Sequence, residues 1–392
     1  MKNYTYIIVG GGMAADSAIQ GIREVDEKGN IALIGAENYP PYNRPPLTKA
    51  LWTGKKKLED IWRQTARHGA DLYLNQRVTS IDPAKKTVTD DQGLQYEYEK
   101  LLLATGGRPR ELPFGTGQIR YFRTLEDYQA LRDQADKGGR FAVIGGGFIG
   151  SELAAALATH KQEVTLIFPG KGICENIFPQ GLVTHLNAYF NEKGVNVLNG
   201  EEVAAVKANG KSVSVQTKKG KKVAVDHVVA GVGIQPNVEL AQQAGLAVDN
   251  GIIVGEDLQS SHADIYAAGD VANFSNILLG GRLRVEHEDN TNTMGKAVGR
   301  NMAGSPTPYE HIPMFYSDLF DLGYEAVGRL DSRLKMVEDW KEEPYKKGVV
   351  YYLDDGNLRG VLLWNVWDKV EAARELMRTV GPKRAENLLG KL

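Results

Sequence analysis

Three features of this 392-residue sequence predict an α/β fold. An apolar strand, a glycine-rich turn and a helix follow one another at residues 4–25, and the same succession recurs at residues 140–168. Residues 309–392 contain strand-like segments, KGVVYYL and RGVLLWNV, followed by the amphipathic helix WDKVEAARELM. We therefore expect two Rossmann-like dinucleotide-binding domains and a C-terminal α/β domain.

Length, charge and cysteine content limit the classes of protein to consider. A chain of 392 residues is long for one compact core, so two or three domains are expected. The net charge of −2 gives no general reason to bind nucleic acid, and no apolar run approaches the roughly 20 residues of a membrane span. The single cysteine, Cys174, excludes an intrachain disulfide and a zinc-type metal cluster. Reducing conditions suit this count, and the N-terminus has no leader-like segment, so we expect a cytoplasmic location.

The first glycine turn has the spacing Gly10-x-Gly12-x-x-Ala15. Gly10 permits the tight turn, Gly12 lets a pyrophosphate approach the backbone, and the small Ala15 lets the helix pack on the strand. The helix N-terminus would then face the phosphates. A second strand ends at Glu37, an acid placed to accept hydrogen bonds from a ribose. Together these features predict dinucleotide binding.

The second turn has the spacing Gly145-x-Gly147-x-x-Gly150 and precedes another helix and strand. Here the strand ends in Pro169-Gly170-Lys171, with no acid where the ribose of NAD would need one. Lys171 would even tolerate the additional phosphate of NADP. The nicotinamide cofactor is therefore NAD(H) or NADP(H), and NADH is slightly favoured.

Residues 40–52, PPYNRPPLTKALW, contain four prolines and two cations, Arg44 and Lys49. Prolines restrict φ, so we expect extended geometry here, with Thr48 capping a helix that begins at Lys49. In this interpretation Arg44 lies over a pyrophosphate and Lys49 points toward the reacting rings. The alternative is a proline-rich surface turn with solvated cations.

The order of the segments is more specific than any one of them. The chain has, in this order, the first glycine turn, LLLATGG, the second glycine turn, VAGVGIQPN and YAAGD. This order resembles that of the two-dinucleotide flavoprotein reductases, which bind FAD and NAD(P)H. Within that group the chain most resembles apoptosis-inducing factor and its bacterial relatives. The segments that carry this resemblance are YNRPPLTKALW, GGGFIGSELA, VEHEDNTNTMGKAVGRNMAG, MFYSDLFDLGYEAVG and GVVYYLDDGNLRGVLLWN. Ferredoxin and rubredoxin reductases are similar as well. The resemblance covers essentially the whole chain and implies an FAD-dependent NAD(P)H oxidoreductase.

The resemblance also implies site residues. The expected FAD contacts are Gly10, Gly12, Met13, Ala14, Ala15, Glu37, Arg44, Lys49, Val78, Ala104, Thr105, Gly106, Arg110, Gly269 and Asp270. The expected residues around the nicotinamide and the flavin are Gly145, Gly147, Phe148, Ile149, Gly150, Glu152, Gly233, Glu286, His287 and Tyr316. Lys49 and Glu152 are the expected catalytic pair, and no metal site is expected.

Two departures from the family limit what can be transferred. Glu288 follows the Glu-His pair where relatives usually carry Trp, which exchanges an apolar ring for a charge. The connection at residues 321–348 is short, without the long insertion of mammalian apoptosis-inducing factor, so a cell-death role is not transferred.

Alternatives remain for the individual residues. Glu152 lies in the first turn of a helix, where a carboxylate gains about 0.3–1 kcal/mol from the helix dipole, so its role could be purely structural. The functional interpretation pairs Glu152 with Lys49, steering the nicotinamide and tuning the flavin. Phe148 is either a gate over the flavin or a helix-packing aromatic, and His287 is assigned to flavin contact only.

The predicted domains are residues 1–118 with 246–308 for FAD, 119–245 for NAD(P)H, and 309–392 at the C-terminus. Without a cysteine pair, electrons must pass directly to an external acceptor, which could be a small iron–sulfur protein, a quinone or oxygen. Three hypotheses remain: an apoptosis-inducing factor-like NAD(P)H oxidoreductase, the ferredoxin or rubredoxin reductase component of an electron-transfer chain, and a flavin redox sensor. The sensor would form a homodimer when reduced and recruit a partner.

Overall fold

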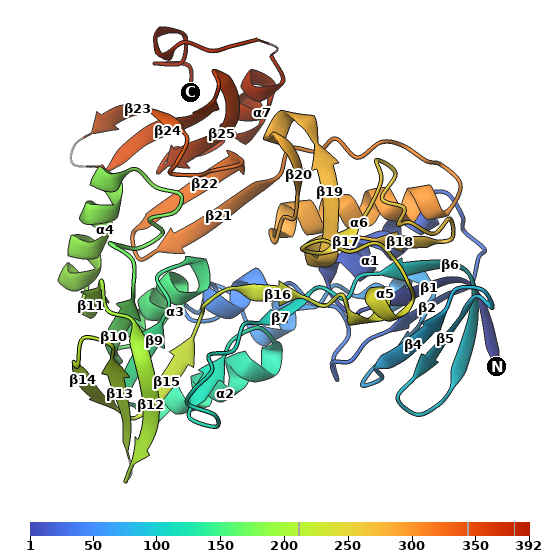
Figure 1. The fold of residues 1–392 in the computed structure, drawn as a ribbon, viewed down its shortest axis with the longest axis horizontal. Helices are drawn as coiled ribbons and strands as arrows, with labels where there is room; N and C mark the ends of the chain where they lie inside the picture. The colour runs from blue at the N-terminus through green and yellow to red at the C-terminus, as the bar shows by residue number, and fades with distance from the viewer. Residues whose placement is uncertain (211, 343–344, 380) are drawn as a thin grey trace. The chain divides into compact units, whose positions relative to one another are not determined.

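A computed structural model describes residues 1–210, 212–342, 345–379 and 381–392 (Figure 1). The chain forms two compact units. Unit 1 comprises Met1–Asn43, Leu58–Arg108 and Gln235–Met314. Unit 2 comprises Arg44–Lys57, Pro109–Ile234 and Phe315–Leu392. The division into three domains remains a prediction.

Unit 1 is built on a seven-stranded sheet with the order β3-β2-β1-β6-β5-β4, in which β18 also pairs with β6. Parallel pairing joins β1 (Lys2–Val9) to β2 (Ile31–Ile34) and to β6 (Gln95–Leu103). The late residues of β6 pair in parallel with β18 (Ile265–Ala267). The other strands are β3 (Ala70–Tyr73), β4 (Val78–Asp82) and β5 (Thr87–Asp90). Residues 31–34, 101–103 and 265–267 of the parallel strands are continuous apolar runs because both faces of the sheet are buried there.

Two helices of unit 1 run side by side, α1 (Met13–Arg23) and α6 (Glu288–Met302) (Figure 1). Glycine permits this close contact, because a Cβ at Gly299 would lie 2.1 Å from the carbonyl oxygen of Ala18. The remaining strands and helices are α5 (Glu239–Gln243), β17 (Ile252–Ile253), β19 (Ala272–Asn276), β20 (Gly281–Leu283) and the short 3₁₀ helices at Leu58–Ile61, Thr65–His68, Gly269–Val271 and Ile277–Leu279.

Unit 2 contains a parallel five-stranded sheet with the order β11-β10-β9-β15-β8. Its strands are β8 (Ile119–Tyr121), β9 (Arg140–Ile144), β10 (Glu163–Phe168), β11 (Val195–Asn199) and β15 (His227–Ala230). The helices that connect them are α2 (Leu125–Asp136), α3 (Phe148–Thr159) and α4 (Gln180–Glu192). An antiparallel ribbon adds β12 (Val203–Asn209), β13 (Ser212–Thr217) and β14 (Lys222–Val225). The lysine-rich segment 218–221 connects β13 to β14.

Two of the five points where the chain passes from one unit to the other lie in the short paired strands β7 (Gly107–Pro109) and β16 (Ile234–Pro236).

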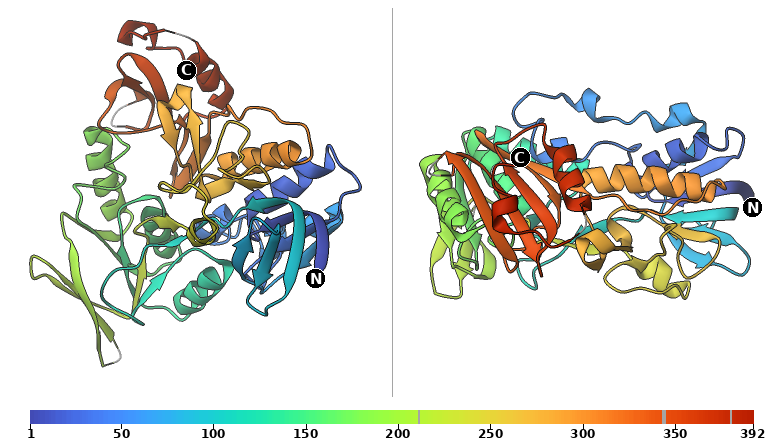
Figure 2. Two further views of the ribbon diagram at one scale, coloured as in Figure 1. Left: turned by 45° about the vertical axis from the view of Figure 1, so that its right-hand side comes forward. Right: turned by 90° about the horizontal axis from the view of Figure 1, so that it is seen from above.

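The C-terminal segment of unit 2 forms a second five-stranded sheet, β21-β22-β25-β24-β23. Its strands are β21 (Met314–Leu319), β22 (Leu322–Gly328), β23 (Lys335–Glu342), β24 (Lys347–Asp354) and β25 (Asn357–Trp364). Helix α7 (Val370–Arg378) packs against β22 and β25 (Figure 2). The predicted strands KGVVYYL and RGVLLWNV and the predicted final helix are therefore present, and a 3₁₀ turn, Ala385–Asn387, follows them.

The prediction for the proline-rich loop is wrong in one respect. Pro45–Thr48 forms a 3₁₀ helix, and Lys49 is its C-cap residue, so Thr48 does not cap a helix that begins at Lys49. Two prolines at the start favour this outcome, because their fixed φ near −65° also suits the first turn of a helix. The turn frees the Thr48 hydroxyl for another partner, described below.

Candidate active site

The first glycine turn, in unit 1, leaves room for a phosphate. Gly10 has φ +121°, and a Cβ there would lie 2.1 Å from the carbonyl oxygen of Ala104, so only glycine fits. Gly12 is the N-cap of α1, and a Cβ at Gly12 would meet nothing within 4 Å. The N-terminus of α1 therefore faces open space with no side-chain cap, as an anion-binding turn requires. These residues fit the pyrophosphate of a dinucleotide.

Other expected FAD contacts of unit 1 lie near this turn. Glu37 accepts a hydrogen bond of 2.6 Å from the hydroxyl of Tyr42. Thr105 donates to the carbonyl of Asn237 at 2.8 Å, which holds the segment after β6 in place. A Cβ at Gly269 would lie 3.0 Å from that of Ala14, so the YAAGD segment also approaches the first turn of α1.

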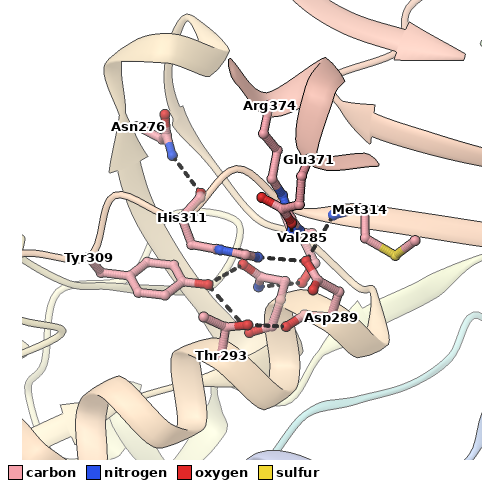
Figure 3. Close-up of polar contacts among 10 residues, drawn as sticks. Asn276, Val285, Asp289, Thr293, Tyr309, His311, Met314, Glu371 and Arg374 are labelled. Carbon is pink, nitrogen blue, oxygen red and sulfur yellow. Dashed lines mark hydrogen bonds and ion pairs between the residues drawn. The ribbon is translucent and has the colours of Figure 1, made fainter. Parts of the chain in front are cut away.

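Helix α6 begins beside these segments, with His287 as its N-cap residue. The sequence analysis did not identify Asp289 in its first turn. Its carboxylate lies 2.6 Å from Nε2 of His311 and accepts a 2.9 Å hydrogen bond from the backbone N–H of Met314 (Figure 3). Asp289 therefore holds the segment that leads into β21 against the start of α6.

The second glycine turn, in unit 2, repeats the first. Gly145 has φ +116°, and a Cβ there would lie 2.3 Å from the carbonyl oxygen of Gly231. Gly147 is the N-cap of α3, and a Cβ at Gly147 would meet nothing within 4 Å. Gly150 packs against the turn itself, since its Cβ would lie 1.9 Å from the carbonyl oxygen of Gly145. A second dinucleotide pyrophosphate fits here for the same reason as in unit 1.

Glu152 has three polar partners among the described residues of unit 2. It is the fifth residue of α3 and lies just beyond the first turn, in which it was predicted to lie, because the helix begins at Phe148. The Nζ of Lys49 lies 2.7 Å from its Oε2, and the side chains are only 11% and 4% exposed. The Thr48 hydroxyl donates to the same oxygen at 2.6 Å, and the Ser317 hydroxyl donates to Oε1 at 2.7 Å. A buried carboxylate is tolerated when it is paired and hydrogen-bonded in this way. The predicted Lys49–Glu152 pair is thus formed in the structure.

Two buried groups, the Cys174 thiol and the Tyr324 hydroxyl, interact electrostatically with this carboxylate. Burial raises the pKa of the Cys174 thiol to about 12, and Ser151 is its hydrogen-bond partner. Burial also raises the pKa of Tyr324 well above its ordinary value, and Cys174 and Glu152 add to the shift. Both groups are therefore neutral at physiological pH.

Aromatic and cationic residues surround the pair. The Nζ of Lys49 lies 5.5 Å from the centre of the Tyr316 ring, whose side chain is 38% exposed. Phe148 packs edge-on against Phe315, with ring centres 5.3 Å apart, a contact that agrees with the helix-packing alternative. Arg44 donates to the carbonyl oxygen of Arg123 at 2.9 Å.

Arg110 and Gly233 lie together in unit 2. The backbone N–H of Arg110 donates to the carbonyl of Gly233 at 2.9 Å, and its side chain donates to the carbonyl of Ile234 at 3.0 Å. Gly233 has φ +92°, which favours glycine at this position.

The expected site residues divide between the two units. Unit 1 contains Gly10, Gly12, Met13, Ala14, Ala15, Glu37, Val78, Ala104, Thr105, Gly106, Gly269, Asp270, Glu286 and His287. Unit 2 contains Arg44, Lys49, Arg110, Gly145, Gly147, Phe148, Ile149, Gly150, Glu152, Gly233 and Tyr316. Ser317, Asp289 and the contact of Thr48 with Glu152 were not predicted. Each of these side chains has a partner at least 22 positions away in the chain, so no local spacing indicates the contact.

Two glycine turns of this form, each opening a helix, define a protein that binds two dinucleotides. Comparison with known families agrees: residues 4–297 match the pyridine nucleotide-disulphide oxidoreductase family. Residues 298–343 and 336–379 match the family described as apoptosis-inducing factor, mitochondrion-associated, C-term. The chain belongs to the pyridine nucleotide-disulphide oxidoreductase family, with a C-terminal domain of the apoptosis-inducing factor type.

Individual relatives point the same way. The chain is 35% identical to apoptosis-inducing factor 1, mitochondrial, of Dictyostelium discoideum, over 96% of this chain and 79% of that protein. It is 34% identical to putidaredoxin reductase of Pseudomonas putida, over 83% of this chain and 80% of that protein. The reductase in a crystal structure of a covalent putidaredoxin reductase–putidaredoxin complex superimposes with a TM-score of 0.90 and 31% identity. That match covers 96% of this chain and 93% of the other.

These findings establish the class of enzyme. The chain is an FAD-dependent NAD(P)H oxidoreductase that delivers electrons to an external acceptor. Its one cysteine, Cys174, cannot form an intrachain disulfide, so the dithiol relay suggested by the family's name does not operate here. Among the residues described, no helix is both long and apolar enough to span a membrane.

Proposed function

We propose that Lys49 and Glu152 are the catalytic pair of this oxidoreductase. The observation that carries the proposal is the 2.7 Å contact between Lys49 and Glu152, nearly excluded from water, near the start of the helix that follows the second glycine turn. FAD held at the first glycine turn would supply the chemistry of hydride acceptance and of electron delivery. Lys49 and Glu152 orient the nicotinamide carboxamide and set the electrostatic field at the reacting rings.

In the same proposal, each of the two glycine turns binds one of the two cofactors. The first glycine turn, Glu37 and Asp270 bind FAD. The second glycine turn binds NAD(P)H, with Phe148 and Tyr316 beside the nicotinamide. Both turns present an uncapped helix N-terminus to open space, which supports this division. The FAD domain then comprises 1–118 with 246–308, and the NAD(P)H domain 119–245.

The test of the catalytic pair is the change Lys49→Met, followed by stopped-flow measurement of flavin reduction by NADH. Loss of one buried electrostatic group at a reacting centre costs about 100-fold or more in other enzymes, and here we expect at least tenfold. Lys55→Met is the matched control, because Lys55 is an exposed lysine of the same loop. An unchanged reduction rate in Lys49→Met would contradict the proposal.

The acceptor we favour is a small iron–sulfur protein. The similarity to putidaredoxin reductase across most of both chains supports it. The C-terminal match to apoptosis-inducing factor supports the alternative, in which reduction produces a homodimer. Reoxidation by a small ferredoxin, a quinone and oxygen should be compared after NADH addition, with the native mass measured in parallel. Rapid reoxidation by the ferredoxin alone supports the first function, whereas a doubled mass supports the second.

The proposed compartment is the cytoplasm. One cysteine, with a buried thiol, suits a reducing environment. Fractionation of the source cells with an antibody to this chain would test the location, and recovery in an organelle fraction would contradict it.

A further inference from the structure

The loop after β10 folds back onto the second glycine turn. The backbone N–H of Cys174 donates to the carbonyl oxygen of Gly146 at 2.8 Å. A Cβ at Gly146 would lie 2.7 Å from the ring of Phe168, the last residue of β10. The glycine turn, the end of β10 and the following loop are therefore in direct contact. In a Rossmann fold this edge, at the end of the second strand, is where the adenosine ribose binds.

This folding brings an acid to the position where the sequence lacks one. Oε2 of Glu175 accepts a hydrogen bond of 2.6 Å from the backbone N–H of Lys171. A Cβ at Gly170 would lie only 2.1 Å from Oε1 of the same carboxylate. The carboxylate thus occupies the space where a side chain of residue 170 would begin. Among the residues described, no donor reaches Oε1, so this oxygen can accept a hydrogen bond from a ligand.

Two asparagine side chains hold the loop that carries Glu175 in place. Asn187 and Asn199 each donate a side-chain hydrogen bond of 2.9 Å to the carbonyl oxygen of Lys171. Asn187 also accepts a hydrogen bond of 3.1 Å from the backbone N–H of Ile173. The carboxylate of Glu175 is consequently held by a loop whose backbone is anchored on both sides of Gly172.

We propose that Glu175 is the residue that selects NAD(H) over NADP(H), by accepting a hydrogen bond from the 2′-hydroxyl of the adenosine ribose. The inference rests on the proposal that the second glycine turn binds the pyridine nucleotide. A 2′-phosphate would place its negative charge against this carboxylate, and like charges at short distance repel. The positive charge of Lys171 would favour a 2′-phosphate and so oppose this selection. However, the backbone N–H of Lys171 donates to Glu175, and its side chain is exposed.

Calorimetric titration of the flavin-loaded protein with ADP-ribose and with 2′-phospho-ADP-ribose tests the proposal. Neither probe carries a nicotinamide, so binding is measured without hydride transfer. Glu175→Gln should weaken ADP-ribose binding about tenfold or more, the usual effect of losing a hydrogen bond to a charged group. The variant should also show a smaller difference in affinity between ADP-ribose and 2′-phospho-ADP-ribose. Glu163→Gln is the matched control, because Glu163 is an exposed acid at the opposite end of β10.

A second variant moves the carboxylate without removing it. Gly170→Ala introduces the Cβ that would collide with Glu175, so it should reduce ADP-ribose affinity in the same direction. Unchanged affinities for both probes in Glu175→Gln would overturn the inference. So would a loss of preference in the Glu163→Gln control that equals the loss in Glu175→Gln.

One more variant separates this inference from the proposal beneath it. Gly147→Asp places a negative charge in the open space at the start of α3. If Gly147→Asp abolishes binding of both probes and Glu175→Gln alters neither, the nucleotide binds at the turn and only the role of Glu175 is wrong. If Gly147→Asp binds both probes normally, the nucleotide binds elsewhere and both proposals fail.

Discussion

The Ser317 hydroxyl donates a hydrogen bond of 2.7 Å to Glu152, although the two residues are 165 positions apart in the chain. Ser317 belongs to β21 of the C-terminal sheet, whereas Glu152 lies in the helix that follows the second glycine turn. The same carboxylate binds Lys49 through its other oxygen. The C-terminal sheet therefore helps to orient the proposed catalytic carboxylate.

The first prediction concerns this hydrogen bond. Ser317→Ala removes one donor from a carboxylate that is 4% exposed, so we expect the free energy of unfolding to fall by about 1–3 kcal/mol. Urea denaturation followed by fluorescence measures the change. Ser332→Ala is the control, because Ser332 binds the carbonyl oxygen of Asn176 through its backbone N–H, which the substitution retains. Equal stabilities of the two variants would show that Oε1 is satisfied by water instead.

The second prediction concerns the coupling between Lys49 and Glu152. Breaking a buried ion pair from one side leaves an uncompensated charge, so Lys49→Met and Glu152→Gln should each destabilise the fold by about 3 kcal/mol. The double variant should be more stable than the sum of the single changes predicts, by about 0.5–3 kcal/mol. A double-mutant cycle in urea measures this coupling free energy. Strict additivity would mean that the 2.7 Å contact contributes no net interaction energy.

The third prediction concerns Cys174. Because burial raises the pKa of its thiol to about 12, only about one molecule in 10⁴ carries a thiolate at pH 8. Ellman's reagent at pH 8 should therefore modify the native protein at least 100-fold more slowly than the same protein in urea. The raised pKa also means that this group stabilises the fold at neutral pH and that the contribution is lost as pH rises from about 9 to 12. Equal rates in the two conditions would contradict a buried thiol.

The fourth prediction concerns the ion pair between Asp226 and Arg140. Hydrogen bonds from the Arg140 side chain and backbone lower the pKa of Asp226 to about 2. A lowered carboxylate pKa adds stability above the unfolded value near 3.9, and this stability disappears as pH falls from about 4 to 2. The Asp226 side chain is 34% exposed, so solvent screening limits the gain to about 1 kcal/mol.

Denaturation of Asp226→Asn and of the unaltered protein between pH 2 and 7 checks this effect. The variant should be less stable at pH 7, and the difference should vanish near pH 2. A difference that stays constant across this range would indicate that the aspartate acts through packing or neutral hydrogen bonds.

Some properties of this protein followed from local sequence. The spacing of Gly10 and Gly12 and of Gly145 and Gly147 predicts the two strand–turn–helix units, because only a residue without a Cβ permits these turns and the approach of a phosphate. The absence of a cysteine partner for Cys174 removes the disulfide relay directly. Short apolar runs predict the last two strands, and the amphipathic pattern of WDKVEAARELM predicts the last helix.

Only the tertiary structure decided which side chains meet. The local rule for Thr48 favoured a helix cap, but the 3₁₀ turn at Pro45–Thr48 directs its hydroxyl to Glu152 instead. The contact of Ser317 with Glu152 joins segments 165 positions apart, and the contact of Cys174 with Gly146 brings the loop that carries Glu175 onto the glycine turn. Neither contact leaves a periodic signal in the sequence. Turn chemistry acts through neighbouring residues and can be read from sequence, whereas a buried carboxylate takes its partners from distant segments brought together by packing.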